Sequence, residues 1–169
     1  MFIKNYGLFW QADEIDWFPR KGEGGRFNML GRQGMNRPGL RLADFKDNPG
    51  IYVLYDNHGA YYTGLTTEQG IGIRLRDHQQ NDHAGNWVRF SWFGFRQVLK
   101  GVDDHGLCRL RELAKLNAGD PKTFIRDVEA LLIKAMGLRN ISQTQFSEAE
   151  EWVQVKSHEK ADFIKRVLG

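Results

Sequence analysis

Side chains that bind phosphate or move protons recur between Tyr52 and His78 of this chain. Tyr52 and Tyr62 lie in two β-branched and aromatic stretches separated by a turn, so a hairpin would bring their hydroxyls together. Arg74 and His78 are four residues apart, which places them on one face of a helix. A guanidinium matches phosphate oxygens in pairs, and an imidazole can exchange a proton near neutral pH. This combination predicts a site for a phosphodiester, whose oxygens gain negative charge in the transition state.

A carboxylate, Glu129, follows on a later predicted helix. Ile125, Leu132 and Ile133 lie three or four residues from it, which predicts that Glu129 stands beside an apolar stripe. Burying an unpaired carboxylate is costly, and a bound cation would offset that cost. A single carboxylate with several waters suits Mg²⁺. Alternatively, Glu129 lies at the edge of the stripe and reaches water.

The order of these residues resembles the GIY-YIG nuclease superfamily from residue 50 to about residue 143. The resemblance rests on Gly50-Ile51-Tyr52, Tyr62-Thr63-Gly64, Arg74 with His78, Glu129 and Asn140. The second triplet has threonine where Tyr-Ile-Gly names the family. The resemblance implies a divalent-metal-dependent endonuclease that hydrolyses DNA phosphodiester bonds.

The same resemblance implies a role for each matched residue. The implied catalytic residues are Tyr52, Tyr62, Arg74, His78 and Glu129. Glu129 would hold Mg²⁺ (or Mn²⁺), and that ion would polarise the scissile phosphate. Asn140 would contact DNA, and Gly50 and Gly64 would be structural turn residues. Which tyrosine acts as the general base stays open, although the family's usual candidate, Tyr52, is preferred.

Each of these residues also has a plain structural interpretation. The two tyrosines could simply pack in strands, Arg74 could be a solvated charge, and Asn140 could be a turn residue. The alternative function is therefore a non-catalytic module that binds nucleic acid or a protein partner. His83 has a poor helical spacing from His78 for a shared metal.

Basic residues are concentrated between Arg20 and Lys46. The segment contains Arg20, Lys21, Arg26, Arg32, Arg37, Arg41 and Lys46 against the acidic Glu23 and Asp44. Glycines in the same segment favour loops. We expect Arg32, Arg37 and Arg41 to contact DNA phosphates or bases. The alternative is a segment that covers the sheet without binding DNA.

Apolar periodicity and turn residues predict an α+β fold with a small antiparallel or mixed sheet of about three strands, flanked by helices. The predicted strands are 51–55, 60–64 and 87–95, and the predicted helices are 73–80, 107–116, 120–136 and 148–167. The chain is divided into an N-terminal basic extension (1–49) that packs on the core, a nuclease-like core (50–143) and a C-terminal helix (144–169).

The 169 residues are 41% hydrophobic and 27% charged, with a formal net charge of +3. These values are typical of one globular domain, and no apolar run approaches the ~20 residues that a membrane span needs. Cys108 is the single cysteine, and the N-terminus does not resemble a signal peptide. We therefore expect a cytoplasmic protein with DNA as its partner and no membrane contact.

Overall fold

A computed structural model of the chain describes residues 3–20, 27–112, 121–137, 146 and 148–169. Its strands are β1 (Asn5–Gln11), β2 (Leu30–Gln33), β3 (Arg41–Asp44), β4 (Gly50–Tyr55), β5 (Ala60–Thr66), β6 (Arg89–Gly94), β7 (Val98–Val102), β8 (Cys108–Leu110), β9 (Glu150–Glu151) and β10 (Val153–Gln154). Its α-helices are α1 (Ile71–His78), α2 (Pro121–Met136) and α3 (Lys160–Leu168). Two 3₁₀ helices, η1 (Ala12–Glu14) and η2 (Ser157–Glu159), precede β2 and α3 respectively.

The strands form two five-stranded sheets. Sheet A has the order β5-β4-β6-β1-β9, and sheet B has the order β10-β2-β3-β8-β7. Both sheets are mixed, because β1 pairs with β9 and β3 pairs with β8 in parallel, while the other pairs are antiparallel. The α+β class is correct, but the prediction of a sheet of about three strands is wrong. The three predicted strands correspond to β4, β5 and β6, which are neighbours in sheet A. Pairing with segments that are distant in the chain adds β1 and β9 to that sheet.

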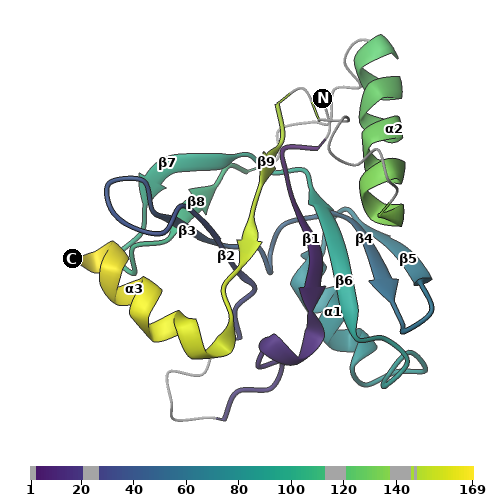
Figure 1. Cartoon of the computed structure of the whole chain (residues 1–169), viewed down its shortest axis with the longest axis horizontal. Coiled ribbons are helices and arrows are strands. Elements are labelled where there is room, and N and C mark those ends of the chain that lie inside the picture. Colours follow the sequence, from purple (N-terminus) through teal and green to yellow (C-terminus); the bar gives the residue numbers. More distant parts are fainter. Residues whose placement is uncertain (1–2, 21–26, 113–120, 138–145, 147) are drawn as a thin grey trace.

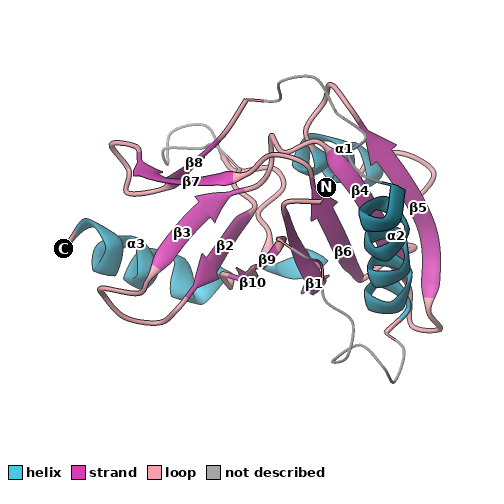
Figure 2. Ribbon diagram, turned by 90° about the horizontal axis from the view of Figure 1, so that it is seen from above, coloured by secondary structure: helices cyan, strands magenta, loops and turns pink. Residues whose placement is uncertain are grey.

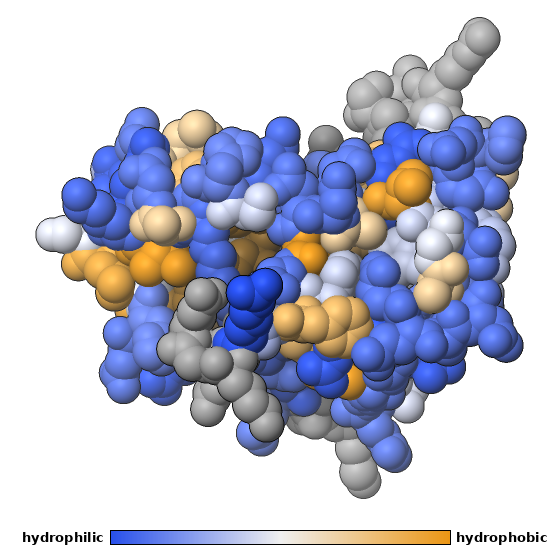
Figure 3. All heavy atoms as spheres, turned by 90° about the horizontal axis from the view of Figure 1, so that it is seen from below, coloured by the Kyte–Doolittle hydropathy of each residue, from blue (hydrophilic) through white to orange (hydrophobic). Residues whose placement is uncertain are grey.

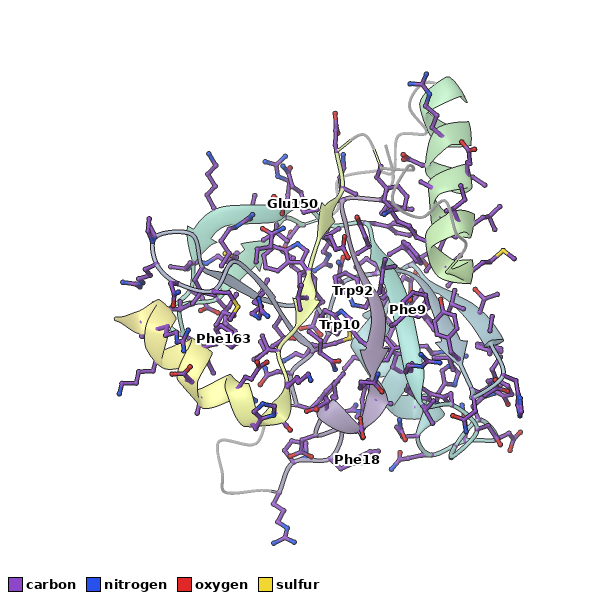
Figure 4. All side chains as sticks on the ribbon, in the orientation of Figure 1. Phe9, Trp10, Phe18, Trp92, Glu150 and Phe163 are labelled. Carbon is purple, nitrogen blue, oxygen red and sulfur yellow. The ribbon has the colours of Figure 1, made fainter. Side chains whose placement is uncertain are left out.

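The two sheets pack against each other through an aromatic core. Trp10 of β1 and Trp92 of β6 meet edge to face, with ring centroids 5.2 Å apart (Figure 4). Phe45, which follows β3 of sheet B, lies 4.3 Å from the Trp92 ring centroid, and Trp152 packs on Phe45. These buried rings hold sheet A onto sheet B, and aromatic burial of this size dominates core energetics.

Helices cover the outer faces of the two sheets. α2 lies beside sheet A and α3 beside sheet B, at opposite sides of the molecule (Figures 1 and 2). Ala130 and Ala135 of α2 pack with Val53 and Tyr55 of β4. Phe163 of α3 packs with apolar residues of β2 and β3. Because side chains alternate along a strand, Tyr52 and Leu54 face the opposite side of sheet A, toward sheet B and α1.

Two segments differ from the sequence predictions. Residues 107–116 were predicted as a helix, but Cys108–Leu110 is strand β8, paired with β3 and β7. The predicted helix 148–167 begins instead with β9 and β10, and α3 starts at Lys160. The N-terminal segment supplies β1, which lies between β6 and β9 within sheet A.

The surface seen in Figure 3 is mostly hydrophilic, with apolar side chains gathered in small patches. Among the residues that the structure describes, no helix combines the length and apolar character needed to cross a membrane.

Candidate active site

The hairpin of β4 and β5 sets the two tyrosines of the candidate site side by side. Tyr52 is paired with Gly64, and Tyr62 with Leu54, in an antiparallel register. The rings of Tyr52 and Tyr62 therefore lie diagonally, with centroids 6.3 Å apart. Tyr52 is 1% exposed, and Tyr62 is half-buried. One hydroxyl is thus enclosed while its neighbour lies closer to solvent.

Gly64 and Gly50 act through their small size rather than as turn residues. Both lie within strands, and neither has a positive φ, so the prediction of turn residues is wrong. A Cβ at Gly64 would lie 2.2 Å from the Tyr52 hydroxyl oxygen, and one at Gly50 would lie 2.1 Å from the Phe93 carbonyl oxygen. The missing side chain of Gly64 therefore leaves the space that the Tyr52 phenol occupies.

The start of α1 is fixed against the segment that leads into β4. The backbone N–H of Ile71 donates to the Asn48 carbonyl, and that of Gly72 donates to the Lys46 carbonyl. A Cβ at Gly72 would lie 2.6 Å from Lys46 Cα, so glycine permits this approach despite its low helix propensity. Ile71 is also buried in the core below the helix. The contact sets the position of the whole short helix.

α1 brings His78 and Arg74 to Tyr52. Ile71, Leu75 and His78 form its buried stripe, at the spacing of one helical face. His78 Nε2 lies 2.7 Å from the Tyr52 hydroxyl oxygen, and the His78 ring centroid lies 5.3 Å from that of Tyr62. Arg74 is half-buried, and it lies close enough to the Tyr52 hydroxyl to lower its pKa, while the neighbouring Tyr62 raises it. The structure thus brings together four of the predicted catalytic residues.

Burial sets the protonation of the central pair. Burial raises the pKa of Tyr52 to about 12, because the ionised phenol would lose its hydration, and the hydrogen bond from Arg74 offsets this only in part. Burial also lowers the pKa of His78, and the nearby His83 and Arg74 add to that effect. At neutral pH the site therefore holds a neutral phenol beside a neutral imidazole.

His83 extends the cluster toward solvent, beyond what the sequence predicted. Its ring centroid lies 4.5 Å from that of Tyr62 and 4.7 Å from that of His78. The exposed Tyr61 hydroxyl lies 3.1 Å from His83 Nδ1. The loop after α1 thus supplies a second, half-buried imidazole at the mouth of the site.

Asn81 is a site residue that sequence reasoning missed. Its side-chain nitrogen lies 3.0 Å from His78 Nδ1, on the side of the ring away from Tyr52. An asparagine three residues after the helical histidine was the available signal. That spacing, however, is equally typical of a residue in the turn that follows a helix.

The structure does not place Glu129 with these residues. Glu129 is exposed on α2, whose buried positions include Asp127, Ala130 and Lys134. α2 packs on the Val53 and Tyr55 face of sheet A, whereas Tyr52 points to the other face. The prediction of a carboxylate on an apolar stripe is therefore wrong, because Glu129 lies on the solvent side of the helix. Asn140 lies outside the described residues.

The predicted DNA-binding arginines lie away from Tyr52, along sheet B. Arg41 binds Glu150 at 2.9 Å and lies over the Trp152 ring. Arg32 stacks over Phe163, and Arg37 lies exposed in the loop between β2 and β3. The contacts of Arg32 and Arg41 support the alternative of a segment that covers the core, and contact with DNA stays a prediction.

The described residues do not fit the metal centre that the resemblance implies. No group of three or more His, Cys, Asp or Glu side chains in the described part of the chain is arranged to hold an ion. Glu129, the implied ligand, lies across sheet A from the tyrosine cluster. The residues brought together around Tyr52 are instead nitrogen and hydroxyl donors, which suit phosphate oxygens.

Comparisons with known proteins add no relative. No family model, curated protein or solved structure matches the chain.

Proposed function

We propose that this protein is an endonuclease that hydrolyses phosphodiester bonds in DNA, with Tyr52, Tyr62, Arg74 and His78 as its active site. One observation carries the proposal: the buried Tyr52 hydroxyl meets His78 Nε2 at 2.7 Å, and Arg74 lies close enough to lower the pKa of that hydroxyl. A buried phenol needs one hydrogen-bond partner, and here an imidazole and a nearby cation both face the hydroxyl. The sequence resemblance to GIY-YIG nucleases supports the same reaction.

The chemistry of the cluster suits a phosphodiester. Arg74 supplies paired N–H donors and positive charge for the phosphate oxygens, which become more negative as water adds to phosphorus. The bond from phosphorus to the leaving oxygen then breaks, and that oxygen takes a proton. Tyr52 is a neutral hydroxyl that can donate it, because its raised pKa keeps its proton in place. This favours Tyr52 as a donor in the ligand-free site over the general base that the family resemblance prefers.

His83 is the group that can accept the proton of the attacking water. Its Nδ1 contacts Tyr61, while no described residue hydrogen-bonds its Nε2. Its ring lies against Tyr62. The proton that His83 takes from water balances the proton that the tyrosine gives to the leaving oxygen, and exchange with solvent restores both groups.

Two features of the proposal remain expectations from the sequence. Dependence on Mg²⁺ or Mn²⁺ is what the family resemblance implies. A cytoplasmic location rests on the single cysteine, Cys108, which is buried and unpaired.

A non-catalytic nucleic-acid-binding module is the second candidate. It is favoured by the position of Glu129, which lies apart from Tyr52. Such a module would bind DNA without needing the Tyr52 hydroxyl or its proton.

Nicking of supercoiled plasmid DNA separates the two candidates. Wild-type protein and Arg74→Ala, purified identically, are incubated with Mg²⁺, with Mn²⁺ and with EDTA. We expect nicked or linear product from the wild type and a large loss with Arg74→Ala, which excludes a contaminating nuclease. Binding to DNA with no product in any of the three conditions would favour the non-catalytic module.

A further inference from the structure

We propose that Asn81 is a positioning residue that holds His78 in the tautomer protonated on Nε2, so that His78 donates its hydrogen bond to Tyr52. The inference deepens the proposed function and rests on it for its catalytic meaning. The hydrogen bonds that carry it do not depend on that function.

A hydrogen bond on the side of the Asn81 amide that faces away from His78 fixes the orientation of the amide. The backbone N–H of His83 donates to Asn81 Oδ1 at 3.0 Å. This bond identifies the oxygen of the amide, so the group facing His78 is the NH₂, 3.0 Å from Nδ1. An NH₂ group can only donate, and Nδ1 must therefore be an unprotonated acceptor.

The protonation of the other ring nitrogen follows. A neutral imidazole carries one proton, so when Nδ1 accepts, Nε2 carries it. Nε2 lies 2.7 Å from the Tyr52 hydroxyl oxygen and donates to it. A doubly protonated ring would set Nδ1–H against the Asn81 NH₂. An amide oxygen at Nδ1 would favour that cation, whereas the amide nitrogen favours the neutral ring.

The neighbours of His78 are consistent with a neutral donor. Burial is the largest cause that lowers the pKa of His78, and His83 in the loop and Arg74 on the same helix add to it, while the contact with Asn81 and the nearby Asp77 act in the opposite direction. The Tyr52 hydroxyl and the Tyr62 ring complete the surroundings from the sheet. The buried ring has little hydration to support an added charge, so the neutral form prevails.

Because Asn81 donates to His78 and His78 donates to Tyr52, the direction in which the Tyr52 hydroxyl can donate its own proton is restricted. Its oxygen accepts from His78, which leaves the hydroxyl proton to be donated elsewhere, and Tyr62 is the neighbouring hydroxyl that acts on it. His78 thus acts as a fixed donor rather than as a base, and Asn81 determines which of the two it can be.

Asn81→Asp tests this arrangement with little change of shape. A carboxylate keeps an acceptor for the His83 backbone N–H, but it cannot donate to Nδ1 and instead draws a proton onto it. Asn86→Asp is the matched control, because Asn86 lies in the same loop and its side chain donates to the Asp82 carbonyl rather than to a histidine ring. Backbone amide spectra establish that each variant is folded.

The readout is the ¹⁵N NMR shifts of the His78 ring in the full chain without DNA. We expect a protonated Nε2 and an unprotonated Nδ1 in the wild type and in Asn86→Asp, and a protonated Nδ1 in Asn81→Asp. A protonated Nδ1 in the wild type would overturn the inference, even if the variant did not fold. An unchanged His78 pattern in folded Asn81→Asp would overturn it too.

Plasmid cleavage by the same proteins separates this inference from the proposed function. Loss of about 10-fold or more in Asn81→Asp alone supports the positioning role, as for groups that orient a site's direct ligands. Wild-type cleavage by folded Asn81→Asp contradicts that role while the nuclease proposal stands. If no protein cleaves DNA, the nuclease proposal and the catalytic role fall together, and the NMR result alone decides the tautomer.

Discussion

The Tyr52 hydroxyl oxygen lies 2.7 Å from His78 Nε2, and both side chains are 1% exposed. Two buried polar groups must satisfy each other or be satisfied by a third group, since an unpaired one costs about 1–3 kcal/mol. Arg74 and Asn81 supply further partners from the edges of the pair. These residues form a connected polar network below the half-buried Tyr62 and His83. A substitution at one member is therefore expected to alter the hydrogen bonds of the others.

Arg74 is the charged member of this network, and its replacement tests electrostatic stabilisation. We expect Arg74→Ala to lower the cleavage rate by on the order of 10²–10³, as the loss of one donor to a developing oxyanion does. Arg74→Lys should recover only part of the rate, because a point charge does not replace the planar fork. Arg76→Ala is the control on the same helix, since Arg76 lies over the Phe27 ring. Full recovery by lysine in rate measurements would contradict paired recognition.

For Glu129, the metal-binding role that the resemblance implies and the exposed position that the structure shows lead to opposite predictions. Its exposure on α2, across sheet A from Tyr52, predicts that Glu129→Ala changes the cleavage rate less than about twofold and stability by less than about 0.5 kcal/mol. Initial rates over a range of Mg²⁺ concentrations make the comparison. A variant that folds normally but no longer cleaves would show that Glu129 acts in the reaction, as the family resemblance implies.

Gly64 is predicted to matter because of the atom that it lacks. A Cβ there would lie 2.2 Å from the Tyr52 hydroxyl oxygen, so Gly64→Ala must displace the phenol. A misplacement of about 1 Å can cost on the order of 10² in rate. Gly101→Ala is the control, because a Cβ at this strand position meets nothing within 4 Å. Wild-type cleavage by Gly64→Ala, with a normal fold by circular dichroism, would mean that the position of Tyr52 is unimportant.

The raised pKa of Tyr52 has a consequence for stability at alkaline pH. The folded pKa of about 12 exceeds the unfolded value near 10, so the contribution of this tyrosine is full below pH 10 and is lost as the pH rises toward 12. Wild type should therefore lose about 1 kcal/mol more than Tyr52→Phe between pH 8 and pH 11. Urea unfolding at both pH values measures the difference. Equal losses would show that Tyr52 is not protected from ionisation.

The sequence predicts this site better than it predicts the fold, and particular residues show why. Tyr52, Tyr62 and His78 lie on a hairpin and a helix that form from neighbouring residues, so their local patterns are informative. Glu129 is different, since the apolar residues around it do not reveal which side of the helix packs. The buried side includes Asp127 and Lys134, charged residues that a hydropathy pattern assigns to the surface.

The missed strands depend on partners that are distant in the chain. β1 pairs with β6 and with β9, and β8 is held between β3 and β7. At β8, pairing with these strands overrides the helical spacing of Leu107 and Leu110. β9 and β10 are only two residues each and flank the buried Trp152. Such short strands carry no periodic signal, so their pairing at the edges of sheets A and B could not be predicted from the sequence.

The most direct test of the central claim is single-turnover cleavage of a labelled DNA duplex by Tyr52→Phe and Tyr55→Phe. Both tyrosines lie on β4 and are buried, but they face opposite sides of sheet A, and the Tyr55 hydroxyl donates to the Ala135 carbonyl. Each change removes one hydroxyl and keeps the ring. We predict that Tyr52→Phe slows cleavage by on the order of 10²-fold, while Tyr55→Phe cleaves at the wild-type rate with about 1 kcal/mol lower stability. Equal cleavage rates for the two variants would contradict an active site at Tyr52.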